Sequence, residues 1–293
     1  MKKFNIVLAV IFMAALVFTS CNKNQAKLPA LNSQIDSLNY AFGLANGNGI
    51  RQYYLQADSA HADTIEAKLK SLFAGIKEGM KGSAEDDTST EIVELGKNIG
   101  SALKEQSKKG LLGDSTLTVD LEIIKQGLVN GLKGSAIQMT PQQANMYLQT
   151  TMQGRRIKQV EKQYAANKAE GEKFLAENKA KPGVITTASG LQYEVIKKGN
   201  GPVPADTSRV KVNYEGKLLD GTVFDSSYKR NEPAVFGVNQ VIKGWTEALK
   251  LMPVGSKYKL YIPQELAYGA QDQASIKPFS VLVFDVELLS IEK

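Results

Sequence analysis

The chain has 293 residues, of which 23% are charged and 43% hydrophobic, and its formal net charge is +6. Acidic and basic residues are interspersed, and no basic stripe is interleaved with aromatic side chains, so nucleic acid is not a predicted partner. The chain holds one cysteine and one histidine, His61. It therefore cannot form an intramolecular disulfide or supply a Cys/His metal site, and we predict neither a metal nor another cofactor.

The first 20 residues predict a signal peptide. Two lysines precede an apolar run from Ile6 to Phe18, which is too short to span a bilayer comfortably. Small residues then lead to Cys21, in an arrangement similar to a bacterial lipoprotein cleavage site. An ordinary secretory signal with an incidental cysteine is the alternative, but Cys21 has no second cysteine to pair with. We expect a lipid on Cys21, with residues 21–34 as a polar tether.

Residues 35–139 predict a helical module made of two similar units. The segment Gly75–Ser83 recurs as Gly127–Ser135 with an offset of 52 residues, and the pair Gly43 and Gly47 recurs as Gly96 and Gly100 with an offset of 53. Apolar residues at helical spacing accompany both copies. Each unit therefore predicts two helices, and the four together cover residues 36–56, 63–81, 89–109 and 118–133.

Glycines four residues apart occur in all four predicted helices. Each glycine inside a helix costs about 1 kcal/mol relative to alanine, so the pairs need a compensating contact. Close approach of one helix backbone to another would provide it, because glycine has no side chain to hold the helices apart. A generic helical core is the alternative. We expect tight helix–helix packing, within one chain or between chains.

Residues 140–182 predict one long helix that links two domains. Thr140, Pro141 and Gln143 form a typical N-terminal cap, and Pro182 and Gly183 follow the end of the helical composition. Forty helical residues span about 60 Å. Residues 165–173 are polar on every side, which is typical of a helix that crosses solvent between domains. Gly154 and Gly171 are possible points of bending.

From residue 183 onward the pattern changes to short strands. Residues 191–195, 210–214 and 258–262 alternate with period two, and residues 281–289 form a strongly apolar strand. Ile242, Trp245 and Leu249 share one helical face between them. The whole chain is therefore predicted as α+β: an all-helical N-terminal module, a long linking helix, and a twisted antiparallel sheet wrapped on a short helix in residues 183–293.

Four sequence blocks in this last region occur in a characteristic order: Val210–Asp225, Val241–Trp245, Ile262–Gly269 and Val281–Leu288. Together they resemble the FKBP family of macrolide-binding peptidyl-prolyl cis/trans isomerases. The helical module and the junction through Phe174–Asn178 and Ser189–Tyr193 resemble the macrophage-infectivity-potentiator and periplasmic chaperone branch of that family. The resemblance implies a homodimer joined by the helical module, and an enzyme that needs no nucleophile, metal or cofactor.

The resemblance also implies a set of site residues. Trp245 would be the floor under a substrate proline, Tyr268 would reach the substrate with its hydroxyl, and Asp225 would lie near the rotating carbonyl. The substrate-binding walls would be Tyr214, Phe224, Phe236, Val241, Ile242, Ile276 and Phe284.

Structural roles compete with these functional ones. Phe236, Phe284 and Trp245 would be core residues on composition alone, and Asp225 could merely bond a nearby tyrosine or backbone group. The loop after Tyr268 also departs from the family, because Lys277 stands where a double proline often begins. The resemblance therefore leaves macrolide affinity open.

The leading hypothesis is a peptidyl-prolyl isomerase that acts on X–Pro bonds of exported proteins and assists their folding in the cell envelope. We expect it to be lipid-anchored, at the outer membrane and facing the periplasm, because no acidic cluster follows Cys21. The alternative is a dimeric chaperone lipoprotein that binds clients with little or no turnover. A lipoprotein adhesin is a third possibility, which no sequence feature supports.

Overall fold

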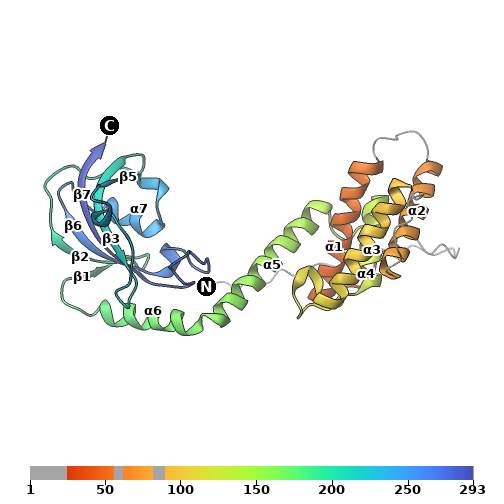
Figure 1. Cartoon of the computed structure of the whole chain (residues 1–293), viewed down its shortest axis with the longest axis horizontal. Helices are drawn as coiled ribbons and strands as arrows, with labels where there is room; N and C mark the ends of the chain where they lie inside the picture. The colour runs from red at the N-terminus through yellow and green to blue at the C-terminus, as the bar shows by residue number, and fades with distance from the viewer. Residues whose placement is uncertain (1–24, 56–61, 82–89, 293) are drawn as a thin grey trace. The chain divides into compact units, whose positions relative to one another are not determined.

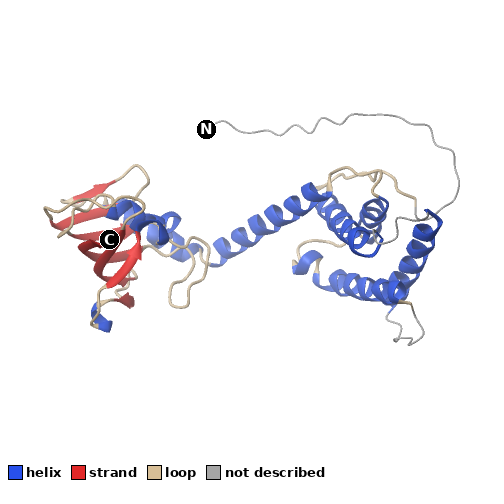
Figure 2. Cartoon of the chain, turned by 90° about the horizontal axis from the view of Figure 1, so that it is seen from above, coloured by secondary structure: helices blue, strands red, loops and turns tan. Residues whose placement is uncertain are grey.

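The computed structural model describes residues 25–55, 62–81 and 90–292, so the predicted signal peptide and Cys21 lie outside the described residues. The chain divides into two compact units, one ending at Thr151 and the other beginning at Met152 (Figure 1). The first unit is helical, and the second combines helices with an antiparallel sheet (Figure 2). The predicted α+β class is confirmed. In the part of the chain described, no helix is both long and apolar enough to cross a membrane.

The helical unit contains the four predicted helices, α1 (Gln34–Ile50), α2 (Ala62–Lys81), α3 (Glu91–Lys109) and α4 (Leu121–Lys133). Ser33 and Asp36 form a capping box at the start of α1, and Asp120 caps α4. Gly134 ends α4 in the left-handed conformation, with φ of 63°, which glycine adopts without strain. A π-helical turn, η1 (Arg51–Leu55), follows α1, and a 3-10 turn, η2 (Leu111–Gly113), follows α3.

The helices pair as α1 with α4 and α2 with α3. The glycine pairs lie at these contacts, which confirms the predicted close packing: a Cβ atom at Gly43 would lie 2.0 Å from the Ile124 carbonyl oxygen, and one at Gly79 would lie 2.0 Å from that of Lys97. Residues of the predicted tether run beside this unit, where Asn130 donates a hydrogen bond to the Lys27 carbonyl at 2.9 Å.

The predicted long helix is divided in two. Helix α5 (Pro141–Gln163) begins with the predicted cap, in which the Gln143 amide N–H donates to Thr140 Oγ1 at 3.1 Å. Tyr164 then leaves the helical conformation, with φ of −108° and ψ of 25°, and α6 (Ala165–Asn178) follows. The break therefore lies at neither of the expected glycines, Gly154 and Gly171.

Helix α6 packs on the C-terminal sheet, so the expectation that residues 165–173 cross solvent is wrong. Asn167 Nδ2 donates to the Pro278 carbonyl at 2.7 Å and lies 3.1 Å from Ser280 Oγ. Gly171 is buried, and a Cβ atom there would lie 2.8 Å from Val281 Cγ2. Within residues 165–173 polar groups and a missing side chain make the contacts, which is why hydropathy alone did not indicate them, and the adjacent Phe174 packs on Tyr261 of the sheet with 5.8 Å between ring centroids.

The C-terminal unit holds one seven-stranded antiparallel sheet in the order β1-β2-β6-β7-β3-β4, with β5 paired to β3. Its strands are β1 (Val184–Thr186), β2 (Gln192–Lys197), β3 (Arg209–Lys217), β4 (Val223–Ser226), β5 (Ala234–Gly237), β6 (Lys257–Ile262) and β7 (Leu282–Glu292). Short 3-10 turns occur at η3 (Tyr228–Arg230), η4 (Val238–Gln240) and η5 (Gln264–Leu266). The sequence predicted the four longest strands and missed the three shortest.

The core of this unit lies between the sheet and helix α7 (Lys243–Leu249), which Figure 1 shows beside the sheet. Alternate residues of β3 and β7 face this core, as a period of two requires, so that Val212 and Val286 are fully buried. Trp245 projects from α7 into the same layer, with 4% of its surface exposed. The short helix and the sheet thus hold the aromatic residues of the site.

Candidate functional site

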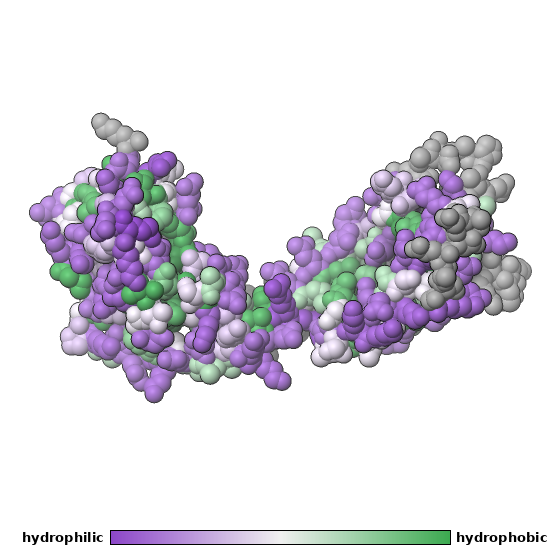
Figure 3. Space-filling model, viewed as in Figure 1, coloured by the Kyte–Doolittle hydropathy of each residue, from purple (hydrophilic) through white to green (hydrophobic). Residues whose placement is uncertain are grey.

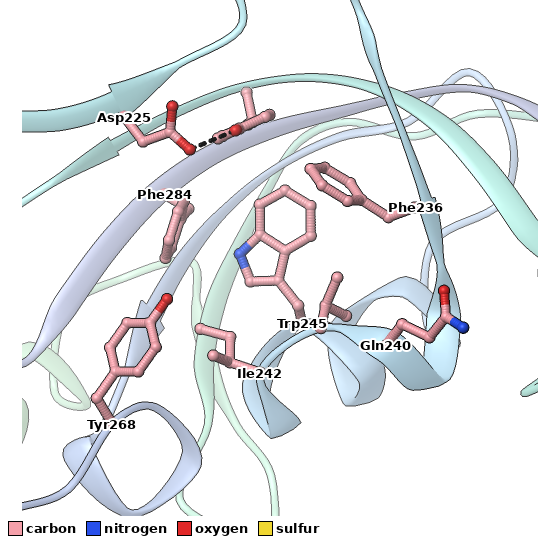
Figure 4. Close-up of a pocket in the computed structure, with 9 residues that line it drawn as sticks. Asp225, Phe236, Gln240, Ile242, Trp245, Tyr268 and Phe284 are labelled. Atoms are coloured by element: carbon pink, nitrogen blue, oxygen red, sulfur yellow. Dashed lines mark hydrogen bonds between the residues drawn. The ribbon is translucent and has the colours of Figure 1, made fainter. Parts of the chain in front are cut away.

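A pocket of about 440 Å³ opens at the side of α7 (Figure 4). Residues from seven parts of the unit converge on it: β3, β4, β5, the segment that leads into α7, α7 itself, the segment after η5, and β7. Its lining residues are Tyr214, Asp225, Phe236, Gln240, Val241, Ile242, Trp245, Tyr268 and Phe284. All are apolar or aromatic except Asp225 and Gln240, so the pocket is an apolar cavity with a single carboxylate at its wall.

Trp245 lines this pocket from α7. Three rings meet the indole edge-to-face: Tyr214 at 5.2 Å between centroids, Phe236 at 5.7 Å and Phe284 at 5.2 Å. This arrangement suits the quadrupoles of the rings and holds the indole in one orientation. Among the described residues the buried indole N–H has no hydrogen-bond acceptor, and in Figure 4 it points toward Phe284, whose ring face can take a weak N–H···π contact.

Asp225 belongs to a three-residue polar network at the pocket wall. The Tyr214 hydroxyl donates to Asp225 Oδ2 at 2.5 Å, and Arg230 Nη1 donates to Asp225 Oδ1 at 2.5 Å. Arg230 Nη2 also donates to the Tyr214 hydroxyl at 2.9 Å. The hydroxyl therefore accepts from the guanidinium and donates to the carboxylate. This observation agrees with the alternative that Asp225 bonds a tyrosine, and it leaves the carboxylate on the pocket wall.

The network sets the ionisation of its members. Burial by itself raises the pKa of Asp225, but the hydrogen bonds from Tyr214 and Arg230 and the charge of Arg230 outweigh it, so that the pKa lies below its usual value. Burial and then the hydrogen bond to Asp225 raise the pKa of the Tyr214 hydroxyl. For Arg230 the main cause is different: its hydrogen bond to Asp225 raises the pKa of the guanidinium. At neutral pH Asp225 is a carboxylate and Tyr214 is a neutral phenol.

The structure brings most of the predicted site residues together. Eight of the ten predicted catalytic and substrate-binding residues line the pocket, and the two exceptions are Phe224 and Ile276. Phe224 packs edge-to-face on Phe284, with 5.4 Å between ring centroids, and Ile276 is 6% exposed in the core of the unit. The lipidation residue Cys21 lies outside the described residues.

Two residues of the site were not predicted. Gln240 lines the pocket just before α7, and Arg230 holds both Asp225 and Tyr214. Arg230 follows Asp225 by five residues in a stretch that also contains Lys229. A basic residue five positions after Asp225 was the only sequence signal for this ion pair. Two adjacent basic residues usually indicate only a solvated surface, so the signal was not used.

The side chains of the pocket are suited to binding an organic ligand. Within the described part of the chain, no three histidine, cysteine or acidic side chains lie close enough together to hold a metal ion. The Tyr268 hydroxyl points into the pocket toward the wall formed by Asp225 and Phe284 (Figure 4). The arrangement therefore suits an apolar ring seated on Trp245, with a polar group of the same ligand near Tyr268 and Asp225.

Two family models match the chain. One, described as FKBP-type peptidyl-prolyl cis-trans isomerase, covers residues 201–289, and the other, described as the domain amino terminal to FKBP-type peptidyl-prolyl isomerase, covers residues 92–195. The first match contains the entire pocket lining. The second contains α3, α4, α5 and α6 but neither α1 nor α2.

Known proteins resemble the same part of the chain. The FKBP-type 22 kDa peptidyl-prolyl cis-trans isomerase of Escherichia coli is 48% identical over 199 residues, which cover 67% of this chain and 92% of that protein. The outer membrane protein MIP of Legionella longbeachae is 38% identical, over 68% of this chain and 83% of that protein. The crystal structure of FkpA from Escherichia coli is 36% identical, covers 72% of this chain and 99% of that chain, and gives a TM-score of 0.45.

Proposed function

The chain belongs to the family of FKBP-type peptidyl-prolyl cis/trans isomerases and is an enzyme of that class, and we propose that its catalytic site is the pocket above Trp245. The observation that carries this assignment is the set of three rings packed edge-to-face around the indole. They hold a flat apolar floor that a proline ring can cover. Eight of the ten residues implied by the family resemblance line this one pocket, which supports the proposal.

The reaction rotates the amide bond before a proline and neither makes nor breaks a covalent bond. Its barrier is about 20 kcal/mol because rotation removes amide resonance. The planar amide carries more negative charge on its carbonyl oxygen than the twisted amide does, so water stabilises the ground state more than the transition state. The apolar pocket removes this difference by excluding water. Every 1.4 kcal/mol gained in this way is about tenfold in rate.

Asp225 adds a fixed negative charge beside the rotating carbonyl. Tyr214 and Arg230 hold the carboxylate at the wall, and its lowered pKa keeps it ionised at neutral pH. A neighbouring carboxylate opposes the charge-separated planar amide more than the twisted one, and so lowers the barrier. Tyr268 donates its hydroxyl to a substrate carbonyl and orients the peptide over Trp245.

A proline-limited isomerisation assay on the mature chain tests this site. Replacing Trp245 with leucine removes the floor while keeping an apolar side chain, so we expect kcat/KM to fall at least tenfold with the circular dichroism spectrum preserved. Full activity in Trp245→Leu would move the catalytic site elsewhere. A mature chain without turnover above the spontaneous rate would favour the alternative function, a chaperone that binds clients without isomerising them.

The cell envelope is the proposed location. The predicted signal peptide of residues 1–20, which ends just before Cys21, supports a lipid anchor, and the name of one relative, an outer membrane protein, supports the outer membrane. In this location the substrates are X–Pro bonds of exported polypeptides, and the enzyme assists their folding from the periplasmic face. Replacing Cys21 with alanine should release the protein from membranes and abolish labelling by a fatty-acid analogue. Unchanged membrane association would contradict the anchor.

Two further predictions concern partners. A macrolide is a possible pocket ligand, because the pocket is apolar and about 440 Å³ in volume. The homodimer through the helical module stays a prediction from the family resemblance, and sedimentation of the mature chain tests it. The packing within that module bears directly on this prediction and points to a different assembly.

A further inference from the structure

The two helical repeats pair with each other and not within themselves. Each repeat contributes a first helix, α1 or α3, and a second helix, α2 or α4. The pairs are α1 with α4 and α2 with α3, so every pair joins the first helix of one repeat to the second helix of the other (Figure 1). The helices of one repeat are therefore not partners in a hairpin.

The contacts within the two pairs are equivalent. A Cβ atom at Gly43 would lie 2.0 Å from the Ile124 carbonyl oxygen, and one at Gly96 would lie 2.3 Å from that of Leu72. These two contacts occupy equivalent positions of the repeat. Gly96 is the equivalent of Gly43, with an offset of 53 residues, and Ile124 is the equivalent of Leu72, with an offset of 52.

The other glycines follow the same rule. A Cβ atom at Gly75 would lie 2.1 Å from the Val93 carbonyl oxygen, and one at Gly127 would lie 2.4 Å from that of Tyr40. Position i of the first copy thus contacts position j of the second, and position i of the second contacts position j of the first. This reciprocity is typical of a two-fold interface between identical subunits. Here the two copies are the repeats of a single chain.

The repeats bury their apolar faces without a second chain. Leu69 and Leu72 of α2 are 2% and 1% exposed, and Leu128 and Leu132 of α4 are 3% and 1% exposed. Figure 3 shows mainly hydrophilic side chains on the visible face of the helical unit, with apolar areas between them. A module that needed a partner would leave these leucines open to water, at a cost of about 25 cal/mol for each Å² of apolar surface.

The family model and one relative match a length that has room for a single repeat. The model of the domain amino terminal to the isomerase begins at residue 92, after α2 has ended. The 22 kDa isomerase of Escherichia coli aligns over 199 residues that make up 92% of its length. The 8% that remains is shorter than α1 and α2 together, which have 17 and 20 residues. A chain with one repeat has no second copy of its own to pack against the glycine-bearing sides of its two helices, which we call the glycine faces.

We propose that the first repeat, residues 34–81, is a built-in partner for the second, so that one chain closes the two-fold interface that a single repeat can complete only with another copy. The helical module is then a pseudo-dimer within one polypeptide. The homodimer implied by the family resemblance is replaced by this internal pairing, and each lipid anchor carries one catalytic domain.

An isotope-mixing experiment tests whether the pairing lies within a chain. Equal amounts of ¹⁴N- and ¹⁵N-labelled mature chain with Cys21→Ser are unfolded together, refolded, and treated with a zero-length carbodiimide. Lys133 Nζ of α4 lies 3.3 Å from Glu66 Oε2 of α2, so the two repeats become joined by an amide bond. We expect the linked peptides to carry one isotope only. A linked population of which about half is mixed would overturn the proposal, and Glu66→Gln is the control that removes the link.

Sedimentation provides an independent test. The mature chain should have the mass of one chain, or, if it associates through another surface, should still give single-isotope links. Deleting residues 25–89 frees the glycine faces of α3 and α4, and we expect that variant to have the mass of two chains. A deletion variant that keeps its helix content as a single chain would contradict the proposal. If the deletion abolishes helix content, the isotope result decides.

Discussion

The Tyr214 hydroxyl lies between Arg230, from which it accepts a hydrogen bond at 2.9 Å, and Asp225, to which it donates one at 2.5 Å. Asp225 therefore owes its position on the pocket wall to a residue of the pocket itself. Substitutions in this network should affect catalysis more than stability.

Replacing Asp225 with alanine should lower kcat/KM about tenfold, because the fixed charge beside the substrate carbonyl is lost. The melting temperature should change little, since the Asp225 side chain is 44% exposed and exposed ion pairs contribute about 0–1 kcal/mol. The matched control is Asp206→Ala. This change removes an exposed ion pair, in which Asp206 Oδ1 lies 2.8 Å from Lys250 Nζ, and neither residue lines the pocket. Equal activity in the two variants would remove Asp225 from the mechanism.

The stability of the C-terminal unit should depend on the ionisation of Asp225 in acid. The folded-state pKa of this carboxyl is lowered, so its stabilising contribution is complete above the unfolded pKa of about 3.9 and is lost as the pH falls through the lower folded value. The difference in unfolding free energy between the native chain and Asp225→Asn should therefore be constant above about pH 5 and shrink below about pH 4. A difference that grows toward low pH would contradict the assigned hydrogen bonds.

Ligands of the pocket should change tryptophan fluorescence, because Trp245 is the only tryptophan in the chain. A proline-containing peptide or a macrolide that covers the indole should shift its emission saturably, and the same peptide with alanine in place of proline should not. An unchanged emission during a measurable isomerisation reaction would show that substrate does not contact Trp245.

Helix α6 should influence substrate binding through the loop that follows Tyr268. Asn167 donates to the Pro278 carbonyl at 2.7 Å, and the next residue, Phe279, has φ of 62°, a conformation that is strained for a residue with a side chain. Asn167→Ala should raise KM for a proline peptide several-fold with kcat nearly unchanged, and reduce stability by about 1 kcal/mol. The control is Lys173→Ala on the same helix, where the side chain is 77% exposed. A fall in kcat alone would contradict a positioning role.

Two glycine substitutions should have opposite effects on the stability of the chain. In Gly47→Ala, the new Cβ would lie 2.3 Å from the Leu128 carbonyl oxygen, so α1 and α4 must separate, at a cost of about 1–3 kcal/mol. In Gly154→Ala, the new Cβ meets nothing within 4 Å, so α5 should gain up to about 1 kcal/mol from higher helix propensity. Thermal unfolding of both variants measures the difference. Destabilisation of similar size in both would mean that close packing is not the reason for the glycines.

Most of the pocket-lining residues could be predicted from the sequence, because they lie within short sequence motifs. The four motif blocks lie on β3 and β4, at the start of α7, from the end of β6 through η5, and on β7, and each block carries its pocket residues at a fixed spacing. Phe224 and Ile276 do not line the pocket in the structure, and their contact with substrate stays a prediction, because alternation along a strand or loop does not say how far a side chain reaches. Arg230 was missed because its two hydrogen bonds lie across β3 and β4, and an exposed arginine has no periodicity of its own.

The helical unit shows a different limit. Periodicity and caps located α1 to α4 to within a few residues, and the glycine pairs indicated close packing. They could not indicate which helices pair, because a first helix fits the second helix of either repeat equally well. The contacts of residues 165–173 with the C-terminal unit were missed for a related reason: Asn167 and Gly171 make them without an apolar side chain, whereas the apolar contact of α6 comes from the next residue, Phe174, which packs on Tyr261.

The crossing of the two repeats also fixes an order of events during synthesis. Helices α2 and α3 are neighbours along the chain, whereas α1 must wait for α4, as the hydrogen bond from Asn39 to the Thr118 carbonyl shows by spanning 79 residues. Closing so long a loop is slower than closing a short one, because more chain entropy is lost before any contact forms. The polypeptide emerges with its N-terminal end first, so α1 is the earliest helix to appear and the last to find its partner. A chain that serves the folding of others thus completes its own helical half only after residues 51–133 have followed its first helix.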